Sequence, residues 1–166
     1  FWLVNSLMTS TTSHSNLRIT RFHVTPLSSK VGMLGWVENT ETMHQVVARN
    51  REKVGEPTEH EIQILNEMMP SREFQSLTNM QKVELFECVH LQTHSSDVAH
   101  NMWHRSTTAE TWLERRTTYT QSLALMSMVG YVLGLGDRHM GNLLMNIKSG
   151  QIVHIDFGDC FDIARL

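Results

Sequence analysis

Asp137-Arg138-His139-Met140-Gly141-Asn142, followed by Asp156-Phe157-Gly158, is the part of the sequence that constrains the fold most. The residues between these motifs form two short apolar runs, 143–147 and 151–155, and the three residues 148–150 between the runs fit a hairpin turn in which Gly150 takes a positive φ. Because a hairpin returns the chain to where it began, we expect Asp156 to lie close to Asp137 and Asn142. The apolar run 123–133 predicts a buried helix that leads into this loop.

Two carboxylates and an amide that converge on one cleft suit phosphoryl transfer from ATP. This reaction needs a carboxylate that accepts or orients the attacking hydroxyl, oxygen ligands that hold Mg²⁺, and a donor that stabilises the developing charge. Asp137, Asn142 and Asp156 supply the oxygen atoms, and His139 supplies a donor. The alternative is a polar loop whose side chains only cap turns. Each residue alone favours that alternative, whereas the ordered set after an apolar helix favours catalysis.

The residues before this region predict strands and then helices. The β-branched run 17–24 predicts a strand that ends before Pro26, and the run 31–37 resembles a second strand that leads into a connector. From Thr40 onward the pattern is helical. Three Thr-x-x-Glu/Gln patterns predict capping boxes at helix starts: Thr58 with Glu61, Thr78 with Gln81, and Thr107 with Glu110. The predicted fold class is therefore α+β.

Composition disfavours several classes of function. A net charge of −3 and a pI near 6.4 give no electrostatic reason to expect nucleic acid or an anionic membrane as the main partner. Two cysteines cannot form a disulfide framework. The apolar opening, residues 1–8, is too short for a membrane span and lacks the basic residues that precede a signal sequence. The first residue is Phe1 and the last, Leu166, follows no turn signal, so we expect an internal piece of a longer protein.

The order Asp-Arg-His, in place of the His-Arg-Asp of ordinary protein kinases, resembles the phosphatidylinositol-3-kinase superfamily when Asp-Phe-Gly follows it. Residues 126–136 and 154–161 are similar to the target-of-rapamycin type of phosphatidylinositol-3-kinase-related protein kinase, and residues 80–84 and 115–124 add to the match. The resemblance covers essentially the whole chain. The chain departs from the family where Met140-Gly141 replace Pro-Ser, where Phe22 replaces a common Tyr, and where Asp162 replaces a Glu.

The resemblance implies a protein-kinase-like fold that is truncated at both ends. Residues 1–34 would end the N-lobe, residues 35–42 would form the hinge region, and residues 43–166 would form most of a largely helical C-lobe. The glycine-rich phosphate loop and the strand lysine would precede Phe1, and the rest of the activation loop would follow Leu166. We therefore expect the 166 residues alone to be inactive.

The resemblance also assigns roles to individual residues. Asp137 would be the catalytic base and His139 the stabiliser of phosphoryl charge. Asn142 and Asp156 would bind Mg²⁺, with Mn²⁺ as an alternative. The ATP site would include a backbone contact of Val37 with adenine, Thr42 near the ribose, and the walls formed by Phe22, Trp36, Leu144 and Ile155.

The implied activity is ATP-dependent phosphorylation of protein serine and threonine residues in growth and nutrient signalling. The implied location is the cytoplasm, or the periphery of endomembranes as part of a complex. About residues 55–96 would bind a small WD-repeat, LST8-like subunit. Two alternatives stay open, a phosphoinositide lipid kinase and a non-catalytic pseudokinase or scaffold. The residues after Asp-Phe-Gly argue against the first, and the presence of Asp137, Asn142 and Asp156 argues against the second.

Four histidines offer a different reading of the helical region. His90 and His94 are four residues apart, as are His100 and His104, and this spacing suits zinc on a helix. Apart from Cys88 and Asp97, no cluster of cysteine or acidic residues accompanies them. We therefore favour solvated helix faces over a zinc site.

Overall fold

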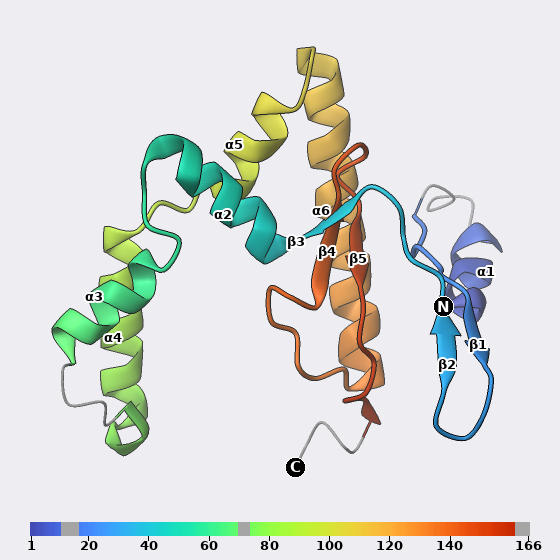
Figure 1. Ribbon diagram of the computed structural model, residues 1–166, viewed down its shortest axis with the longest axis horizontal. Coiled ribbons are helices and arrows are strands. Elements are labelled where there is room, and N and C mark those ends of the chain that lie inside the picture. The colour runs from blue at the N-terminus through green and yellow to red at the C-terminus, as the bar shows by residue number, and fades with distance from the viewer. Residues whose placement is uncertain (11–16, 70–73, 162–166) are drawn as a thin grey trace. The chain divides into compact units, whose positions relative to one another are not determined.

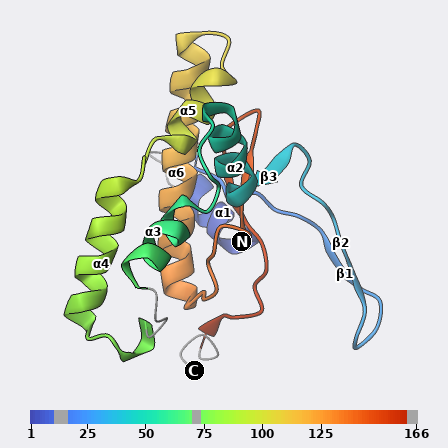
Figure 2. The same cartoon turned by 60° about the vertical axis from the view of Figure 1, so that its left-hand side comes forward.

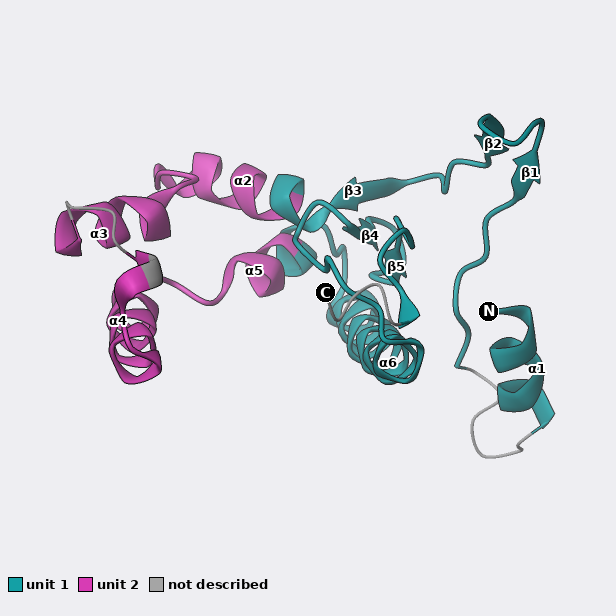
Figure 3. Cartoon of the chain, turned by 90° about the horizontal axis from the view of Figure 1, so that it is seen from below, with its two compact units in different colours: residues 1–45, 102–166 teal, residues 46–101 magenta. Residues whose placement is uncertain are grey.

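The computed structural model describes residues 1–10, 17–69 and 74–161. The chain forms two compact units, which Figure 3 shows in different colours. Unit 1 contains residues 1–45 and 102–166, and unit 2 contains residues 46–101. Helices and strands are both present, which confirms the predicted α+β class.

The predicted hairpin is present in unit 1. Strand β4 (Leu143–Asn146) pairs antiparallel with β5 (Ile152–His154), and β3 (Thr40–Thr42) pairs with the other edge of β4 (Figure 1). Gly150 has a φ of 79°, and a Cβ at this position would lie 2.6 Å from the main-chain oxygen of Arg115. The turn therefore requires glycine. Because residues 40–42 form a strand, the helix expected from Thr40 begins at Met43, as α2 (Met43–Val54).

Helix α6 (Ala109–Leu133) supports the hairpin from one side. The N–H of Ile152 donates to the Ser122 hydroxyl at 2.9 Å, and Met126 is almost completely buried. The opposite face of the last turns is open, since Tyr131 is 85% and Val132 is 77% exposed. The predicted helix is confirmed, but its predicted burial holds for one face only. The helix ends at Gly134 in the left-handed conformation that glycine favours there.

The N-terminal part of unit 1 differs most from the prediction. It contains α1 (Trp2–Ser10) and a two-stranded antiparallel sheet of β1 (Val24–Pro26) and β2 (Gly32–Leu34). The strand predicted within 31–37 is confirmed, whereas the strand predicted for 17–24 is wrong over residues 17–23. Ile19 bonds instead to the side chain of Asn5, which donates to its main-chain oxygen at 2.9 Å and accepts from its N–H at 2.8 Å. An amide side chain thus replaces a neighbouring strand.

Unit 2 is helical. Helix α3 (His60–Met68) lies beside α4 (Asn79–Gln92) in Figures 1 and 2, with Ile64, Leu85 and Val89 buried. A short 3₁₀ helix, η1 (Phe74–Ser76), precedes α4, and α5 (Asp97–His104) follows it. In the described residues no helix combines the length and the apolar composition that crossing a membrane requires.

Only one of the three predicted capping boxes is present as predicted. Thr78 and Gln81 exchange the expected hydrogen bonds at the start of α4. Helix α6 is capped one residue later than predicted, because the hydroxyl of Thr108 accepts from the N–H of Thr111 at 3.2 Å. Thr58 does not cap α3, since its predicted partner Glu61 faces an arginine instead.

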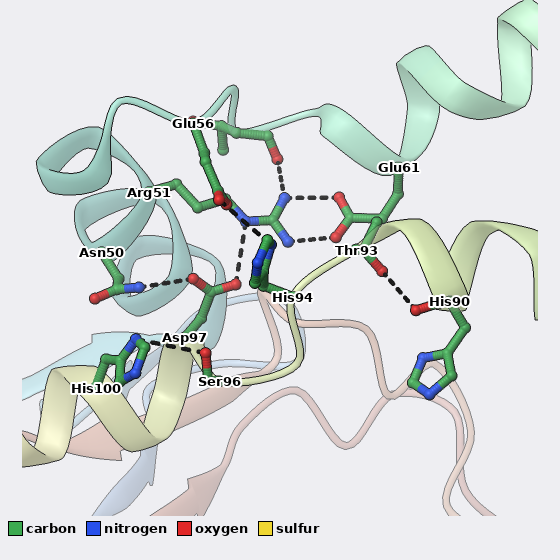
Figure 4. A network of polar contacts seen from close by, with 11 residues as sticks. Asn50, Arg51, Glu56, Glu61, His90, Thr93, His94, Ser96, Asp97 and His100 are labelled. Carbon is green, nitrogen blue, oxygen red and sulfur yellow. Dashed lines mark hydrogen bonds and ion pairs between the residues drawn. The ribbon is translucent and has the colours of Figure 1, made fainter.

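That arginine, Arg51, joins three helices of unit 2 (Figure 4). It lies on α2 and is 6% exposed; its Nη1 donates to Glu61 at 2.6 Å and its Nε to Asp97 at 3.1 Å. Asn50 donates to the second oxygen of Asp97 at 2.8 Å. The hydrogen bond with Glu61 raises the pKa of Arg51, and the same bond lowers the pKa of Glu61. Asn50 and Arg51 precede residues 52–96, and Asp97 follows them. The network therefore joins the two ends of this segment to each other.

Neutralising Glu61 tests this network. Because the folded-state pKa of Glu61 is lowered, its carboxylate stabilises the fold above the ordinary pKa of glutamate, and this contribution is lost as the pH falls through the folded-state pKa. For Glu61→Gln we expect about 1 kcal/mol less local stability at pH 7, since a partly exposed ion pair contributes little more. When the pH is then lowered, the variant should lose less stability than the wild type, because it has no carboxylate to protonate at this position.

Hydrogen exchange of residues 46–69 and 79–101, corrected for the intrinsic effect of pH, measures both differences. Glu59→Gln is the control, because Glu59 is exposed at the start of the same helix and makes no side-chain cap. Equal protection in the two variants would contradict the proposed contribution of Glu61.

Candidate active site

The loop after α6 and the end of β5 share an uncommon backbone conformation. Asp137 has a φ of 52° and Asp156 a φ of 57°, and they are two of the four non-glycine residues with positive φ among those described. This conformation is costly for most side chains, tolerated best by Asp and Asn, and frequent at functional sites. Aspartate thus suits both positions in its backbone preference as well as its chemistry.

Asn142 fixes the carboxylate of Asp137. The buried amide donates from Nδ2 to the main-chain oxygen of Asp137 at 3.0 Å and to its Oδ2 at 3.2 Å. Nε2 of His139 lies 3.8 Å from the same Oδ2. The structure therefore brings these three predicted site residues together within one loop, while half of the Asp137 side chain stays exposed.

Gly141 determines the position of the His139 ring. Its N–H donates to Nδ1 of His139 at 3.0 Å, so in the neutral imidazole the proton lies on Nε2, the nitrogen that faces Asp137. A Cβ on residue 141 would lie 2.8 Å from Cε1 of this ring. Gly141 thus permits a ring position that a larger residue would obstruct.

Arg138 holds the loop against the end of β5. Its Nε donates to the main-chain oxygen of Gly136 at 2.6 Å, its Nη1 donates to that of Ile155 at 2.7 Å, and its Nη2 donates to that of Asp156. Two main-chain bonds add to this contact: Ile155 N–H donates to Asn142 at 3.1 Å, and Gly136 N–H donates to Asp159 at 2.8 Å. Arg138 had no role in the prediction, although it lies inside the motif. Together with the two main-chain bonds, it joins the loop that contains Asp137 and Asn142 to the segment that contains Asp156.

Phe157 anchors the residue after Asp156 among other aromatic rings. Its centroid lies 5.1 Å from that of Phe1 in an edge-to-face arrangement and 6.2 Å from that of Phe22 in a stacked one. The Arg138 guanidinium lies 5.9 Å from the same ring. The Asp-Phe-Gly motif is thus attached to the residue before α1, to the segment before β1, and to the loop 136–142.

A cavity of about 390 Å³ lies next to Asp156 in unit 1. Its walls include five of the six residues predicted to contact ATP, and the structure adds Leu34, Gly35 and Asp156 to them. The predicted residues are Phe22, Trp36, Val37, Leu144 and Ile155. Leu144 reaches the cavity because it lies in β4, the central strand. The volume and the mainly apolar walls are typical of a site for a small molecule.

Thr42, the sixth predicted ATP contact, is not among the residues that line this cavity. It lies opposite Leu144 in the sheet and begins α2 with a capping box, in which its hydroxyl accepts from the N–H of Gln45 at 3.1 Å and its own N–H donates to Gln45 at 2.9 Å. The position of Thr42 near a ribose therefore stays a prediction.

His154, which precedes Ile155 and Asp156 in the sequence, is buried. Neither ring nitrogen has a hydrogen-bond partner among the described residues. Burial, together with the positive charge of Arg138, lowers the pKa of His154 to about 4. The ring is therefore neutral at pH 7, and it adds no positive charge that would repel Arg138.

The donor atoms at the site fit a hard divalent cation. Since Asn142 Nδ2 is bound to Asp137, the amide oxygen Oδ1 is the atom left to face a cation. Asp156 is exposed, and its Oδ1 accepts a 3.3 Å bond from Gly158. Amide and carboxylate oxygens are the ligands that Mg²⁺ uses. In the described residues no three His, Cys, Asp or Glu side chains gather as a metal site. Asp162 lies outside the described residues.

Comparison with known proteins agrees with this geometry. Residues 1–165 match the model of the family described as phosphatidylinositol 3- and 4-kinase. The chain belongs to this family. The chain is 48% identical to the serine/threonine-protein kinase tor1 of Schizosaccharomyces pombe over 99% of its own length. It is 46% identical to the target of rapamycin homolog of Caenorhabditis elegans over 100% of its own length. It spans 7% and 6% of those two proteins.

A solved structure shows the same fold. The FAT and kinase domain of CtTel1 superposes on 96% of the chain with a TM-score of 0.80 at 29% identity, and the chain covers 11% of that structure. The chain is therefore a member of the phosphatidylinositol-3-kinase-related protein kinases, and its sequence is similar to those of the target-of-rapamycin type, as its motifs predicted.

Replacing Arg138 tests how the site is held together. For Arg138→Lys we expect the segments 136–142 and 155–161 to exchange amide hydrogens at least about tenfold faster, because one ammonium group cannot span three carbonyl oxygens and each hydrogen bond from a charged donor contributes roughly 1.5–3 kcal/mol. Hydrogen exchange with mass spectrometry measures these segments directly.

Arg116→Lys is the matched control. Arg116 is exposed on α6 and lies 5.3 Å from the Trp112 ring, a contact that lysine retains. Unchanged exchange at both segments of the Arg138 variant would show that the carbonyl contacts do not hold the site.

Proposed function

We propose that the whole protein is a serine/threonine protein kinase that uses ATP and Mg²⁺. The observation that carries the proposal is that Asn142 binds the carboxylate of Asp137, that the main chain of Ile155 binds Asn142, and that the next residue, Asp156, lines an apolar cavity. Because the chain spans only 6–7% of its target-of-rapamycin relatives, the activity is assigned to the whole protein. The 166 residues contain no glycine-rich phosphate loop, and alone they should not catalyse.

In the proposed reaction, the hydroxyl oxygen of a substrate serine or threonine bonds to the γ-phosphorus of ATP. The bond from that phosphorus to the oxygen bridging the β- and γ-phosphates breaks, and ADP leaves. Asp137 accepts the hydroxyl proton, for which its half-exposed carboxylate is accessible. His139 donates from Nε2 to a γ-phosphoryl oxygen, and the Gly141 contact at Nδ1 keeps the proton on that nitrogen.

The remaining residues bind and orient. Adenine fits between Phe22, Trp36 and Leu144, where the cavity is apolar, and the main chain of Val37 supplies its hydrogen bonds. When bound, Mg²⁺ offsets the charge of the phosphates, and Asn142 and Asp156 would hold it through their side-chain oxygens. Arg138 keeps these two residues on adjoining segments.

Protein is favoured over lipid as the substrate class. Of three relatives with 46–48% identity, two are named serine/threonine-protein kinase (tor1 and mTor), and the other is named target of rapamycin homolog. The family as a whole is named for phosphatidylinositol kinases. An assay of the purified protein with radiolabelled ATP, offering a serine/threonine peptide mixture in one arm and phosphatidylinositol vesicles in the other, decides the point. Transfer to lipid alone would refute the proposed substrate class.

Asp137→Asn tests the catalytic role. In the whole protein we expect kcat for peptide phosphorylation to fall by about 10²-fold or more, because a positioned base contributes roughly 10²–10⁴-fold, while ATP binding is largely kept. Steady-state kinetics measure the first quantity and nucleotide titration the second. Glu114→Gln, which removes an exposed charge on α6, is the control. Wild-type turnover in Asp137→Asn would refute the role of Asp137.

We also propose that about residues 55–96 bind a small WD-repeat subunit, and that the complex acts in the cytoplasm or at the periphery of endomembranes. The supporting observation is a row of exposed apolar side chains on α4, where Met80 is 75%, Val83 is 55% and Phe86 is 71% exposed. Their spacing puts them on one face of the helix, away from the buried Leu85 and Val89. An exposed apolar face of this kind marks a site of protein contact.

Phe86→Ala tests the partner surface. A buried aromatic anchor at an interface contributes roughly 2 kcal/mol or more, so recovery of the WD-repeat subunit with the whole protein should weaken by about thirtyfold in affinity. Quantitative pull-down against a titration of the subunit measures it. Leu113→Ala is the matched control, since Leu113 is 55% exposed but lies outside residues 55–96. Undiminished recovery from a protein that lacks residues 55–96 would refute the assignment.

A further inference from the structure

The first 37 residues carry a charge opposite to that of the chain as a whole. They contain Arg18, Arg21 and Lys30 but no aspartate or glutamate, whereas the whole chain has a net charge of −3. A segment without acidic residues attracts anions even when the protein around it is acidic.

Two of these cations face one cavity. Between α1 and residues 18–21 lies a cavity of about 480 Å³. Arg18 and Arg21 line one side of it, and the other side is formed by a single face of α1. That face consists of Trp2, Asn5, Ser6 and Thr9. None of these residues lines the cavity next to Asp156, so the two cavities are distinct.

The walls of this cavity are fixed to one another. The two hydrogen bonds between Asn5 and Ile19, 2.9 and 2.8 Å long, attach α1 to the segment that carries both arginines. Gln151 donates to the main-chain oxygen of Arg18 at 2.9 Å and anchors that segment a second time. Behind it, Ile19 packs in a buried cluster with Leu125 and Met126 of α6. The arginines therefore extend from a backbone that is held on two sides.

Both guanidinium groups are available to a ligand. Among the residues that the structure describes, no carboxylate pairs with Arg18 or Arg21. A guanidinium group presents paired N–H donors that match the oxygen spacing of a phosphate. The Ser6 hydroxyl and the Trp2 indole N–H offer further donors on the opposite wall.

We propose that this cavity, the arginine pocket, binds a phosphorylated sugar or polyol, either free or as the headgroup of a lipid. Two cations and no acidic lining residue favour an anion with more than one negative charge. The volume exceeds that of a single phosphate ion, and Trp2, which is 65% exposed, offers a flat apolar face against which a ring can pack. The site is independent of the proposed kinase activity.

Binding by the purified whole protein tests the arginine pocket. The soluble probe is fructose 1,6-bisphosphate, titrated by calorimetry, and the lipid probe is a phosphatidylcholine vesicle that contains phosphatidylinositol 4-phosphate, tested by flotation. The variant is Arg18→Gln with Arg21→Gln. The matched control is Lys30→Gln, which removes a charge from the same acid-free segment but lies outside the pocket. Circular dichroism establishes that both variants are folded.

We expect at least one probe to bind the wild type and Lys30→Gln equally, and to bind the double variant at least about tenfold more weakly, because two charge-assisted contacts are lost. The probe that binds identifies the free or the lipid-borne source. Failure of both probes, equal binding by the double variant, or equal weakening in Lys30→Gln would overturn the proposal. Since no catalysis is measured, these outcomes do not depend on whether the protein is a kinase.

Discussion

The contacts of one guanidinium group, that of Arg138, are the constraint on which the candidate active site depends. A single planar group binds the main-chain oxygens of Gly136, Ile155 and Asp156, which belong to two segments that the sequence separates by a whole hairpin. Carbonyl oxygens near a chain reversal need hydrogen-bond donors. One guanidinium group supplies several N–H donors in a fixed plane. The two aspartates with positive φ, Asp137 and Asp156, lie on the two segments that this group joins. Their unfavourable backbone conformation persists because the surroundings determine it.

The hairpin and α6 give that contact a rigid base. Leu144, in the middle strand, pairs with both β3 and β5, and its buried side chain forms part of the cavity wall. The hydrogen bond from Ile152 to Ser122 attaches the last strand to the helix whose end begins the catalytic loop. Both segments of the site therefore start from one packed layer.

Much of this arrangement could be predicted because local chemistry dictates it. Gly150 in the turn and Thr78 at the start of α4 are local patterns, and Asp137 and Asn142, five residues apart, are joined by a hydrogen bond. The failures share the opposite cause. Glu61 leaves its predicted capping box for Arg51, and residues 17–23 satisfy Ile19 with an amide from α1 instead of a strand. In both cases a partner distant in sequence wins over a local preference, and periodicity carries no information about such a partner. Arg138 escaped prediction for a related reason, since main-chain oxygens leave no trace in the sequence.

The central place of arginine in Asp-Arg-His follows from this geometry. In an extended or irregular loop, neighbouring side chains point to different sides of the backbone. Arg138 extends toward the end of β5, whereas Asp137 and His139, on either side of it, come within 3.8 Å of each other. The middle residue of the motif thus holds the structure together, and the outer two side chains stay partly exposed, as the proposed reaction requires. An order with aspartate in the centre would direct the carboxylate toward the carbonyl oxygens of Ile155 and Asp156, where it would meet only acceptors. The motif is therefore one way to place a carboxylate, an imidazole donor and a structural cation on three consecutive residues.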